Sequence, residues 1–315
     1  CNKLRSGRMD EIRPCISCQE GCMGRIQEYS ALNCAVNPQA CRERYTAYTP
    51  ILKPKKVMVI GGGVAGCEAA RVLAIRGHKP EVFEAKSYLG GNLIPGGAPG
   101  FKKDDIALAD WFTRQLELLE VPVHCNALVT TEMVIKGHYD AVICATGSQP
   151  KMFSLGDDSR VYSAADVLTG KKDPGQTVVV VGGGLVGCET ALWLAQNGKT
   201  VKIVEALDKL LALNGPLCHA NSEMLERLIP FHGIETIVNA KVSSYQNGKL
   251  ILQSRGDTIN LSCDSVVLAV GYKENNDLYQ SLEFDIPELY CLGDSKKVSN
   301  IMYAIWDAFE VANHI

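Results

Sequence analysis

The chain has 315 residues, of which 46% are hydrophobic and 21% are charged, and its formal net charge is −3. This composition is typical of a soluble globular protein long enough for two domains, and it gives no electrostatic reason to expect a nucleic-acid or membrane partner. No apolar run approaches the ~20 residues that a membrane-spanning helix requires.

The first 50 residues are polar and rich in cysteine. Six of the 13 cysteines lie in the first 41 residues, and the other seven are scattered singly. A dense cluster followed by isolated thiols is typical of a metal site with reduced, buried cysteines elsewhere, rather than of a disulfide framework. We therefore expect residues 1–50 to form a metal-binding segment and the protein to reside in the reducing cytoplasm.

Four cysteines of this segment have a spacing that suits a metal site. They are Cys15, Cys18, Cys22 and Cys34, separated by two, three and eleven residues. Three close thiolates with a fourth further along the chain suit a [4Fe–4S] cluster. Four thiolates also suit a structural zinc ion, although such sites favour two paired C-x-x-C knuckles and only one occurs here. The spacing favours the cluster and leaves zinc open.

A βαβ pattern begins after a short linker of proline and lysine. The apolar run 57–60 leads into three spaced glycines and a helical stretch, and a second strand is expected at 81–84. The pattern recurs 121 residues later (182 minus 61). Such glycines let the pyrophosphate of a dinucleotide approach the backbone where a helix starts. They are Gly61, Gly63 and Gly66 in the first copy and Gly182, Gly184 and Gly187 in the second.

An acidic residue ends the second strand of each copy. Glu84 and Glu205 each follow the first glycine of their copy by 23 residues, where a carboxylate accepts hydrogen bonds from ribose hydroxyls. Glu205 is followed by Ala206 and Leu207. A carboxylate without an adjacent basic residue would repel the 2′-phosphate of NADPH. We therefore predict NADH as the nucleotide of the second copy.

Further strands run into glycine turns at corresponding places. One covers 140–147 and ends at Gly147, and its counterpart covers 264–271. A last strand, 289–292, ends at the pair Gly293-Asp294, and a closing helix is expected from about residue 300. Tandem copies with these features resemble the flavoproteins that have two dinucleotide-binding domains.

The resemblance covers roughly residues 55–315 and implies an α/β fold with two Rossmann-like domains. It implies an FAD-binding domain at 51–150 plus 272–315, with an NAD(H)-binding domain inserted at 151–271. In that family the first glycine turn holds the ADP part of FAD, and the late Gly-Asp pair holds its ribitol. The FAD-binding residues implied here are Gly61, Gly63, Gly66, Glu84, Asn92, Gly147, Gly293 and Asp294, and the NAD-binding residues are Gly182, Gly184, Gly187 and Glu205.

The residues around the four cysteines resemble a narrower group. The stretches 11–22 (Glu-Ile-Arg-Pro-Cys-Ile-Ser-Cys-Gln-Glu-Gly-Cys) and 34–38 (Cys-Ala-Val-Asn-Pro) are similar to the iron–sulfur flavoenzymes related to 2,4-dienoyl-CoA reductase, 2-enoate reductase and trimethylamine dehydrogenase. In that group the four matching cysteines bind a [4Fe–4S] cluster. One departure is Cys41, which stands where the group usually has glycine before Arg-Glu.

The same group places an FMN-bearing TIM barrel before the cysteine segment, and this chain starts with Cys1, within the stretch that follows such a barrel. We expect the native polypeptide to be longer, or the barrel to be a separate subunit. The resemblance implies electron transfer from NADH through FAD to the cluster and on to FMN, which would reduce an activated C=C bond. No catalytic acid can be assigned in this chain, and the unsaturated substrate stays open.

Two alternatives differ in function. The small subunit of glutamate synthase also places cysteines before tandem nucleotide domains, but the cysteine spacing and Glu205 fit it less well. The other alternative is a structural domain that binds nucleotides without redox activity, since ADP alone can occupy the first site in trimethylamine dehydrogenase. The redox cysteine pairs of disulfide reductases do not occur in this sequence, so electrons that leave a flavin need another exit.

Overall fold

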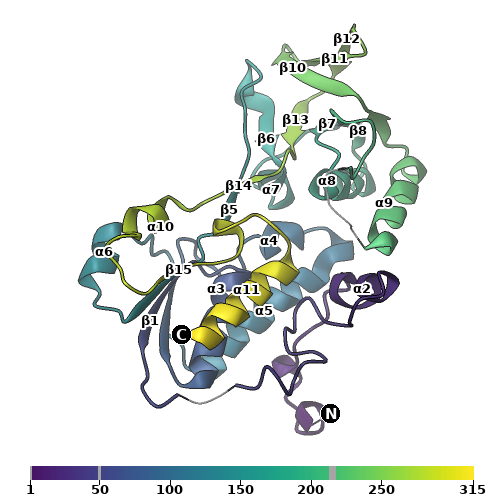
Figure 1. Cartoon of the computed structure of the whole chain (residues 1–315). Coiled ribbons are helices and arrows are strands. Elements are labelled where there is room, and N and C mark those ends of the chain that lie inside the picture. The colour runs from purple at the N-terminus through teal and green to yellow at the C-terminus, as the bar shows by residue number, and fades with distance from the viewer. Residues whose placement is uncertain (1, 49–50, 213–217) are drawn as a thin grey trace. The chain divides into compact units, whose positions relative to one another are not determined.

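The computed structural model describes residues 2–48, 51–212 and 218–315, which form two compact units (Figure 1). The cysteine-rich segment is part of the first unit, and so is the end of the chain. The second unit consists mainly of the inserted stretch from Pro150 to Lys273. None of the helices in the described residues combines the length and the apolar character that a membrane span requires.

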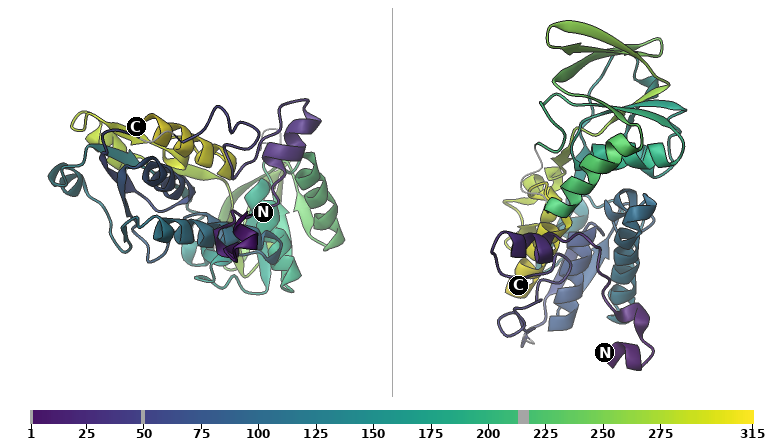
Figure 2. Two further views of the ribbon diagram at one scale, coloured as in Figure 1. Left: turned by 90° about the horizontal axis from the view of Figure 1, so that it is seen from below. Right: turned by 90° about the vertical axis from the view of Figure 1, so that its right-hand side faces the viewer.

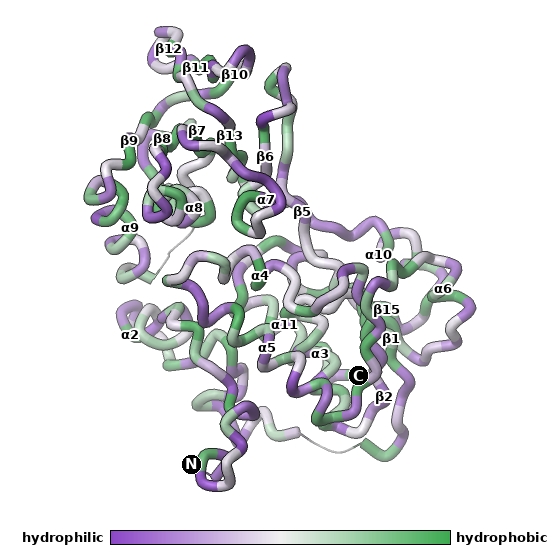
Figure 3. The backbone as a smooth tube through the Cα atoms, turned by 180° about the vertical axis from the view of Figure 1, so that it is seen from behind, coloured by the Kyte–Doolittle hydropathy of each residue, from purple (hydrophilic) through white to green (hydrophobic). Residues whose placement is uncertain are grey.

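A parallel five-stranded sheet forms the centre of the first unit. Its strand order, β15-β4-β1-β2-β3, is that of a doubly wound sheet, with β1 at the centre. The central strand is apolar (Figure 3), and Val57 and Val59 are completely buried because side chains pack on both faces of the sheet. The strands are β1 (Lys56–Ile60), β2 (Lys79–Phe83), β3 (Val123–His124), β4 (Ala141–Cys144) and β15 (Leu289–Cys291).

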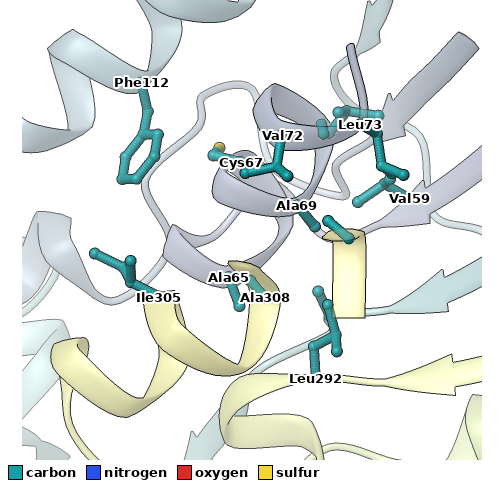
Figure 4. Packing of buried hydrophobic residues seen from close by; sticks show 14 of the residues in the cluster. Val59, Ala65, Cys67, Ala69, Val72, Leu73, Phe112, Leu292, Ile305 and Ala308 are labelled. Atoms are coloured by element: carbon teal, nitrogen blue, oxygen red, sulfur yellow. The ribbon is translucent and has the colours of Figure 1, made fainter. Parts of the chain in front are cut away.

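Three helices pack on one face of this sheet (Figures 1 and 2). They are α3 (Val64–Arg76), α5 (Lys103–Leu118) and α11 (Ile301–His314). Figure 4 shows Ala65 of α3 beside Ala308 of α11, with Phe112 of α5 in the same cluster. Because many of the facing side chains are small, α3 and α11 can approach each other closely.

The other helical elements of the first unit are short. The helices are α1 (Asn2–Arg5), α2 (Arg25–Gln27), α4 (Leu93–Gly96), α6 (Thr131–Lys136) and α10 (Asp277–Leu282). The cysteine-rich segment also contains a 3₁₀ turn at Met9–Glu11 and a π-helical turn at Glu20–Gly24. A further 3₁₀ turn, Gly293–Ser295, follows β15.

The second unit repeats this architecture. Its parallel sheet has the order β6-β13-β7-β8-β9, in which β7, β8, β9 and β13 take the places of β1, β2, β3 and β4. An antiparallel meander, β10-β11-β12, forms a separate sheet. The strands are β6 (Val161–Ser163), β7 (Thr177–Val181), β8 (Thr200–Val204), β9 (Glu235–Ile237), β10 (Ala240–Gln246), β11 (Lys249–Ser254), β12 (Asp257–Ser262) and β13 (Ser265–Leu268). The helices are α7 (Ala164–Leu168), α8 (Leu185–Gln196) and α9 (His219–Phe231).

The chain passes between the units through two short strands. They are β5 (Ser148–Pro150) and β14 (Tyr272–Glu274), which pair with each other. The chain therefore leaves the first sheet after β4, builds the second unit, and returns to place β15 beside β4. The predicted α/β fold with two Rossmann-like dinucleotide-binding folds is confirmed.

Candidate functional site

The two glycine turns have the same backbone geometry. Gly61 has a φ of +106° and Gly182 a φ of +107°, in the region that glycine adopts without strain. The third glycine lies so close to the first that a Cβ on Gly66 or Gly187 would overlap the carbonyl oxygen of the first. Each turn leads directly into a helix, α3 or α8, whose first N–H groups have no partner within the helix. Both turns therefore present the open backbone that a pyrophosphate requires.

The acid at the end of each second strand is hydrogen-bonded to its own glycine turn. Glu84 accepts a hydrogen bond from the N–H of Gly62 at 2.7 Å, and Glu205 accepts one from Gly183 at 2.5 Å. The other oxygen of each carboxylate accepts a backbone N–H two residues further on, at 2.8 Å in both copies. These bonds fix each carboxylate beside its turn and leave lone pairs for ribose hydroxyls.

Residues predicted at the flavin end of the first site form a hydrogen-bonded chain. Asn92 Nδ2 donates to Ser148 Oγ at 3.4 Å, and Ser148 donates to Asp294 Oδ2 at 2.9 Å. The N–H of Ser299 donates to Asp294 Oδ1 at 3.0 Å. Sequence reasoning missed Ser148, although its place directly after Gly147 is a signal that could have found it.

The two glycines at the ends of β4 and β15 complete this corner. Gly147 has a φ of +71° and Gly293 a φ of +58°. Gly293 lies against α3, since a Cβ on it would be 2.9 Å from the Cβ of Ala65. Its N–H donates to Asp307 of α11 at 3.0 Å. The predicted FAD residues, which come from separate stretches of the chain, therefore lie at the end of one sheet where β1, β4 and β15 finish.

The four cysteines of the predicted metal site share one neighbourhood, which we call the cysteine loop (residues 15–34). Cys18 is half-buried, and this burial, together with the thiols of Cys22, Cys34 and Cys15, raises its pKa to about 11. The N–H of Ser17 donates to Cys15 Sγ at 3.3 Å. The thiols of Cys15, Cys22 and Cys34 therefore lie near that of Cys18.

Backbone contacts hold the first part of the cysteine loop against its last part. The carbonyl of Gly21 accepts a hydrogen bond from Asn33 at 2.7 Å, and a Cβ on Gly21 would lie 2.8 Å from the backbone nitrogen of Ala35. Only glycine fits there without a shift of the chain. Cys22 and Cys34, which follow Gly21 and Asn33, are brought together by this contact.

The two candidate metals need different arrangements of the four thiolates. Across residues 2–48, 51–212 and 218–315, no three His, Cys, Asp or Glu side chains converge on a position for a single ion. A zinc ion would need its four sulfur atoms at about 2.3 Å from one centre. A [4Fe–4S] cluster binds its four thiolates through four separate irons and so needs a wider arrangement. Four thiolates suit either group.

Cys41 lies outside the cysteine loop and has a strained backbone. Its φ is +63°, in the left-handed region, and its side chain is exposed. This conformation explains why glycine suits the position in the group that the sequence resembles.

Replacing Cys41 with glycine is expected to stabilise the protein by about 0.5–1 kcal/mol. The left-handed conformation destabilises the folded state by about 1–2 kcal/mol for a residue with a Cβ, and glycine removes this strain. Glycine also makes the unfolded chain more flexible, which offsets about 0.5–1 kcal/mol of the gain. The midpoint of urea unfolding measures the change. Cys41→Ala removes the thiol but keeps the Cβ and should leave the midpoint unchanged, so equal midpoints for both variants would contradict the strain argument.

Two arginines and a glutamate fasten the cysteine loop to α3; we call them the Arg13–Glu68–Arg71 triad. Glu68 is fully buried and pairs with Arg71 at 2.8 Å and with Arg13 at 3.2 Å. Burial opposes the ionisation of Glu68, but the two guanidinium groups outweigh it and hold its pKa below the usual value. Arg13 also donates to the carbonyl of Val36 and lies over the ring of Trp111, 4.3 Å from its centroid. Sequence reasoning missed this triad.

Two tryptophans add contacts to the same segment. Trp111 Nε1 donates to the carbonyl of Glu11, and Trp306 Nε1 donates to that of Cys34, both at 3.1 Å. Trp111 is also buried in the core of the first unit. The segment that carries the predicted ligands is therefore packed on α3, α5 and α11.

Five of the seven scattered cysteines are buried like packing residues, and the other two, Cys125 and Cys291, are half-buried. Burial raises the pKa of Cys144 and of Cys188 to about 12, and it also raises that of Cys67. Thiols that stay protonated in apolar surroundings are poor nucleophiles. None of the described cysteines forms a disulfide.

Comparison with known proteins places this geometry in a family. Residues 55–292 match the family described as Pyridine nucleotide-disulphide oxidoreductase. A cinnamate reductase of Clostridium sporogenes is 47% identical over 100% of this chain, and an NADH oxidase of Thermoanaerobacter brockii is 36% identical over 98% of it. The chain covers 47% and 49% of these proteins, so it spans about half the length of the curated relatives it matches.

Solved structures share the fold over the whole chain. A 2-naphthoyl-CoA reductase has a TM-score of 0.93 at 26% identity, covering 100% of this chain and 48% of that one. A histamine dehydrogenase from Rhizobium sp. 4-9 has a TM-score of 0.85 at 21% identity, covering 100% of this chain and 50% of that one. Both alignments include the cysteine-rich segment.

Proposed function

Because the chain belongs to the pyridine nucleotide-disulphide oxidoreductase family, a family of oxidoreductases that implies FAD and NAD(H), we propose that it carries electrons from NADH through FAD to a [4Fe–4S] cluster. We assign FAD to the first glycine turn and NADH to the second. The cluster ligands are Cys15, Cys18, Cys22 and Cys34. The FAD site comprises Gly61, Gly63, Gly66, Glu84, Asn92, Gly147, Gly293 and Asp294, and the NADH site comprises Gly182, Gly184, Gly187 and Glu205.

One observation carries this proposal. The cysteine loop is fastened by Arg13 to Glu68 of α3, and α3 is the helix that begins at the first glycine turn. A metal-binding loop and a dinucleotide site thus share one helix. A nucleotide-binding domain without redox activity has no need of four clustered thiols at this place, and a disulfide reductase would route its electrons through a cysteine pair instead.

The chemistry requires a carrier that changes between two-electron and one-electron steps. NADH gives up two electrons as a hydride, a cluster takes one electron at a time, and a flavin can do both. The role of this chain is to bind the three carriers in the sequence NADH, FAD, cluster. Glu84 and Glu205 orient the two ribose groups, Asn92 and Asp294 hold the ribityl end of FAD, and the cysteine loop provides the exit.

We further propose that the electrons pass to an FMN-bearing TIM barrel that reduces an activated C=C bond. Cinnamate, named in the 47% identical relative, has a C=C bond conjugated to a carboxylate, and such a bond accepts hydride from a reduced flavin. The barrel would belong to the same polypeptide or to a separate subunit. A reducing compartment, the cytoplasm, suits the free cysteines.

The visible spectrum of anaerobically purified protein, recorded before and after addition of NADH, tests the proposal. We expect flavin bands that bleach with NADH, superimposed on the broad brown absorbance of an iron–sulfur cluster. A colourless protein that binds only adenine nucleotides would overturn the electron-transfer function and favour a structural domain.

Replacing Glu205 with alanine is expected to raise KM for NADH about tenfold and to reduce the discrimination against NADPH. A hydrogen bond from a ribose hydroxyl to a carboxylate contributes about 1.5–3 kcal/mol, and the carboxylate also repels a 2′-phosphate. The nearby cation Lys202 is already paired with Glu235 at 2.6 Å. The measurement is the ratio of kcat/KM for the two nucleotides. Glu84→Ala, the matched change in the first copy, should lower FAD content and leave this ratio unchanged.

A further inference from the structure

We propose that the net positive charge of the Arg13–Glu68–Arg71 triad raises the reduction potential of the cluster in the cysteine loop. The inference rests on the proposed function, because it presupposes that the cysteine loop holds the cluster. It assigns a role to three charged residues that neither dinucleotide site uses.

The triad holds a net positive charge largely out of water. The side chains of Arg13, Glu68 and Arg71 are 15%, 0% and 7% exposed. Within the described part of the chain, Glu68 is the one carboxylate that pairs with either guanidinium, and the other partner of Arg71 is the neutral hydroxyl of Tyr48 at 2.8 Å. Two cations and one anion leave one positive charge uncompensated. A buried charge of this kind is costly unless an opposite charge lies nearby.

The position of Arg13 indicates where that opposite charge belongs. Arg13 lies two residues before Cys15, and it donates to the carbonyl of Val36, two residues after Cys34. One guanidinium therefore joins both ends of the cysteine loop. A cluster with four thiolate ligands is an anion, and reduction adds one more negative charge. A cation held at both ends of the loop stabilises the reduced form, because cluster potentials respond to the charge around them.

The internal repeat separates this role from the needs of the helix itself. The positions 121 residues after Glu68 and Arg71 are Glu189 and Leu192, in α8 of the second copy. Leu192 is buried, so a helix after a glycine turn of this kind packs well with leucine in the place of Arg71. Of the two copies, the one that carries the cysteine loop has an arginine at this position.

A potentiometric titration of the full-length protein, with EPR spectroscopy of the reduced cluster, tests this role. Arg13→Gln should leave about tenfold less cluster reduced at a given solution potential, a shift of about 59 mV to lower potential for one electron. Glu68→Gln should shift the potential upward by a similar amount, because the triad then has two uncompensated cations. Both expectations correspond to one unit charge acting over about 10 Å at an effective dielectric constant of about 20.

Arg114→Gln is the matched control. Arg114 is exposed and pairs with Asp10 of the same segment at 2.7 Å, so the variant removes an equal charge and an equal tether at a place that water and salt screen. No shift is expected. If Arg13→Gln fails to retain iron, Arg71→Leu serves as the second variant, because leucine stands at the corresponding position of the second copy. It also removes one positive charge from the triad and should lower the potential.

The outcomes separate this inference from the proposed function. Shifts of opposite sign for Arg13→Gln and Glu68→Gln support the electrostatic role, since mere loosening of the loop would move both in one direction. Potentials that do not move, or that move together, in variants that retain the cluster overturn the inference and leave the proposed function intact. A wild-type protein that holds no iron overturns both.

Discussion

Replacing Cys18 with serine is expected to lower the iron content from about four atoms per chain to near zero. Cys18 is one of the proposed ligands, and its half-buried thiol lies near those of the other three. A serine hydroxyl remains protonated near neutral pH and is a poor substitute for a soft thiolate ligand. Iron and acid-labile sulfide per chain measure the loss. Bleaching of the flavin by NADH should stay within about twofold, because both dinucleotide sites remain intact.

Cys41→Ser is the matched control for this prediction. Cys41 is exposed and stands outside the cysteine loop, so its loss should leave the iron content unchanged. Loss of iron in the Cys41 variant with retention in the Cys18 variant would show that the ligand set is wrong. If the wild-type protein contains zinc and lacks the brown absorbance, the four cysteines bind a structural zinc ion, the alternative that their spacing left open.

The dinucleotide folds could be predicted from the sequence because their signals are local. The glycine turn and the acid after the second strand lie within one βαβ unit, so their spacing along the chain determines how they lie relative to each other in space. The return of the chain to the first sheet was predicted from the resemblance to flavoproteins with two dinucleotide-binding domains. Gly293-Asp294 follows an apolar strand, and that strand takes its place as β15 beside β4.

The contacts that hold the cysteine loop could not be predicted because they join residues distant in sequence. Arg13 meets Glu68 across 55 positions, and Trp306 meets Cys34 across 272. Glu68 and Arg71 are three residues apart on a helix, a spacing that ordinarily indicates an exposed ion pair. Only the packing of Trp111 and the cysteine-rich segment over this face turns them into a buried group. Charged residues in an otherwise apolar helix were the available signal.

Replacing Gly187 with alanine is expected to raise KM for NADH at least tenfold while FAD stays bound. A Cβ on Gly187 would overlap the carbonyl oxygen of Gly182, so the second turn must open and its N–H groups must leave the positions that suit a pyrophosphate. Gly66→Ala makes the same change in the first turn, where the overlap is with Gly61. That variant should lose FAD, and with it all reduction by NADH.

The pair of variants tests which copy holds which nucleotide. FAD content comes from the flavin absorbance of the purified protein, and KM for NADH is measured on chains with FAD bound. Gly100→Ala is the control, because a Cβ there meets no atom within 4 Å and Gly100 is not among the glycines with positive φ. If Gly187→Ala loses FAD and Gly66→Ala retains it, the two assignments must be exchanged. If both variants lose FAD equally, the change has destabilised the folds, and the turns have not been distinguished by their ligands.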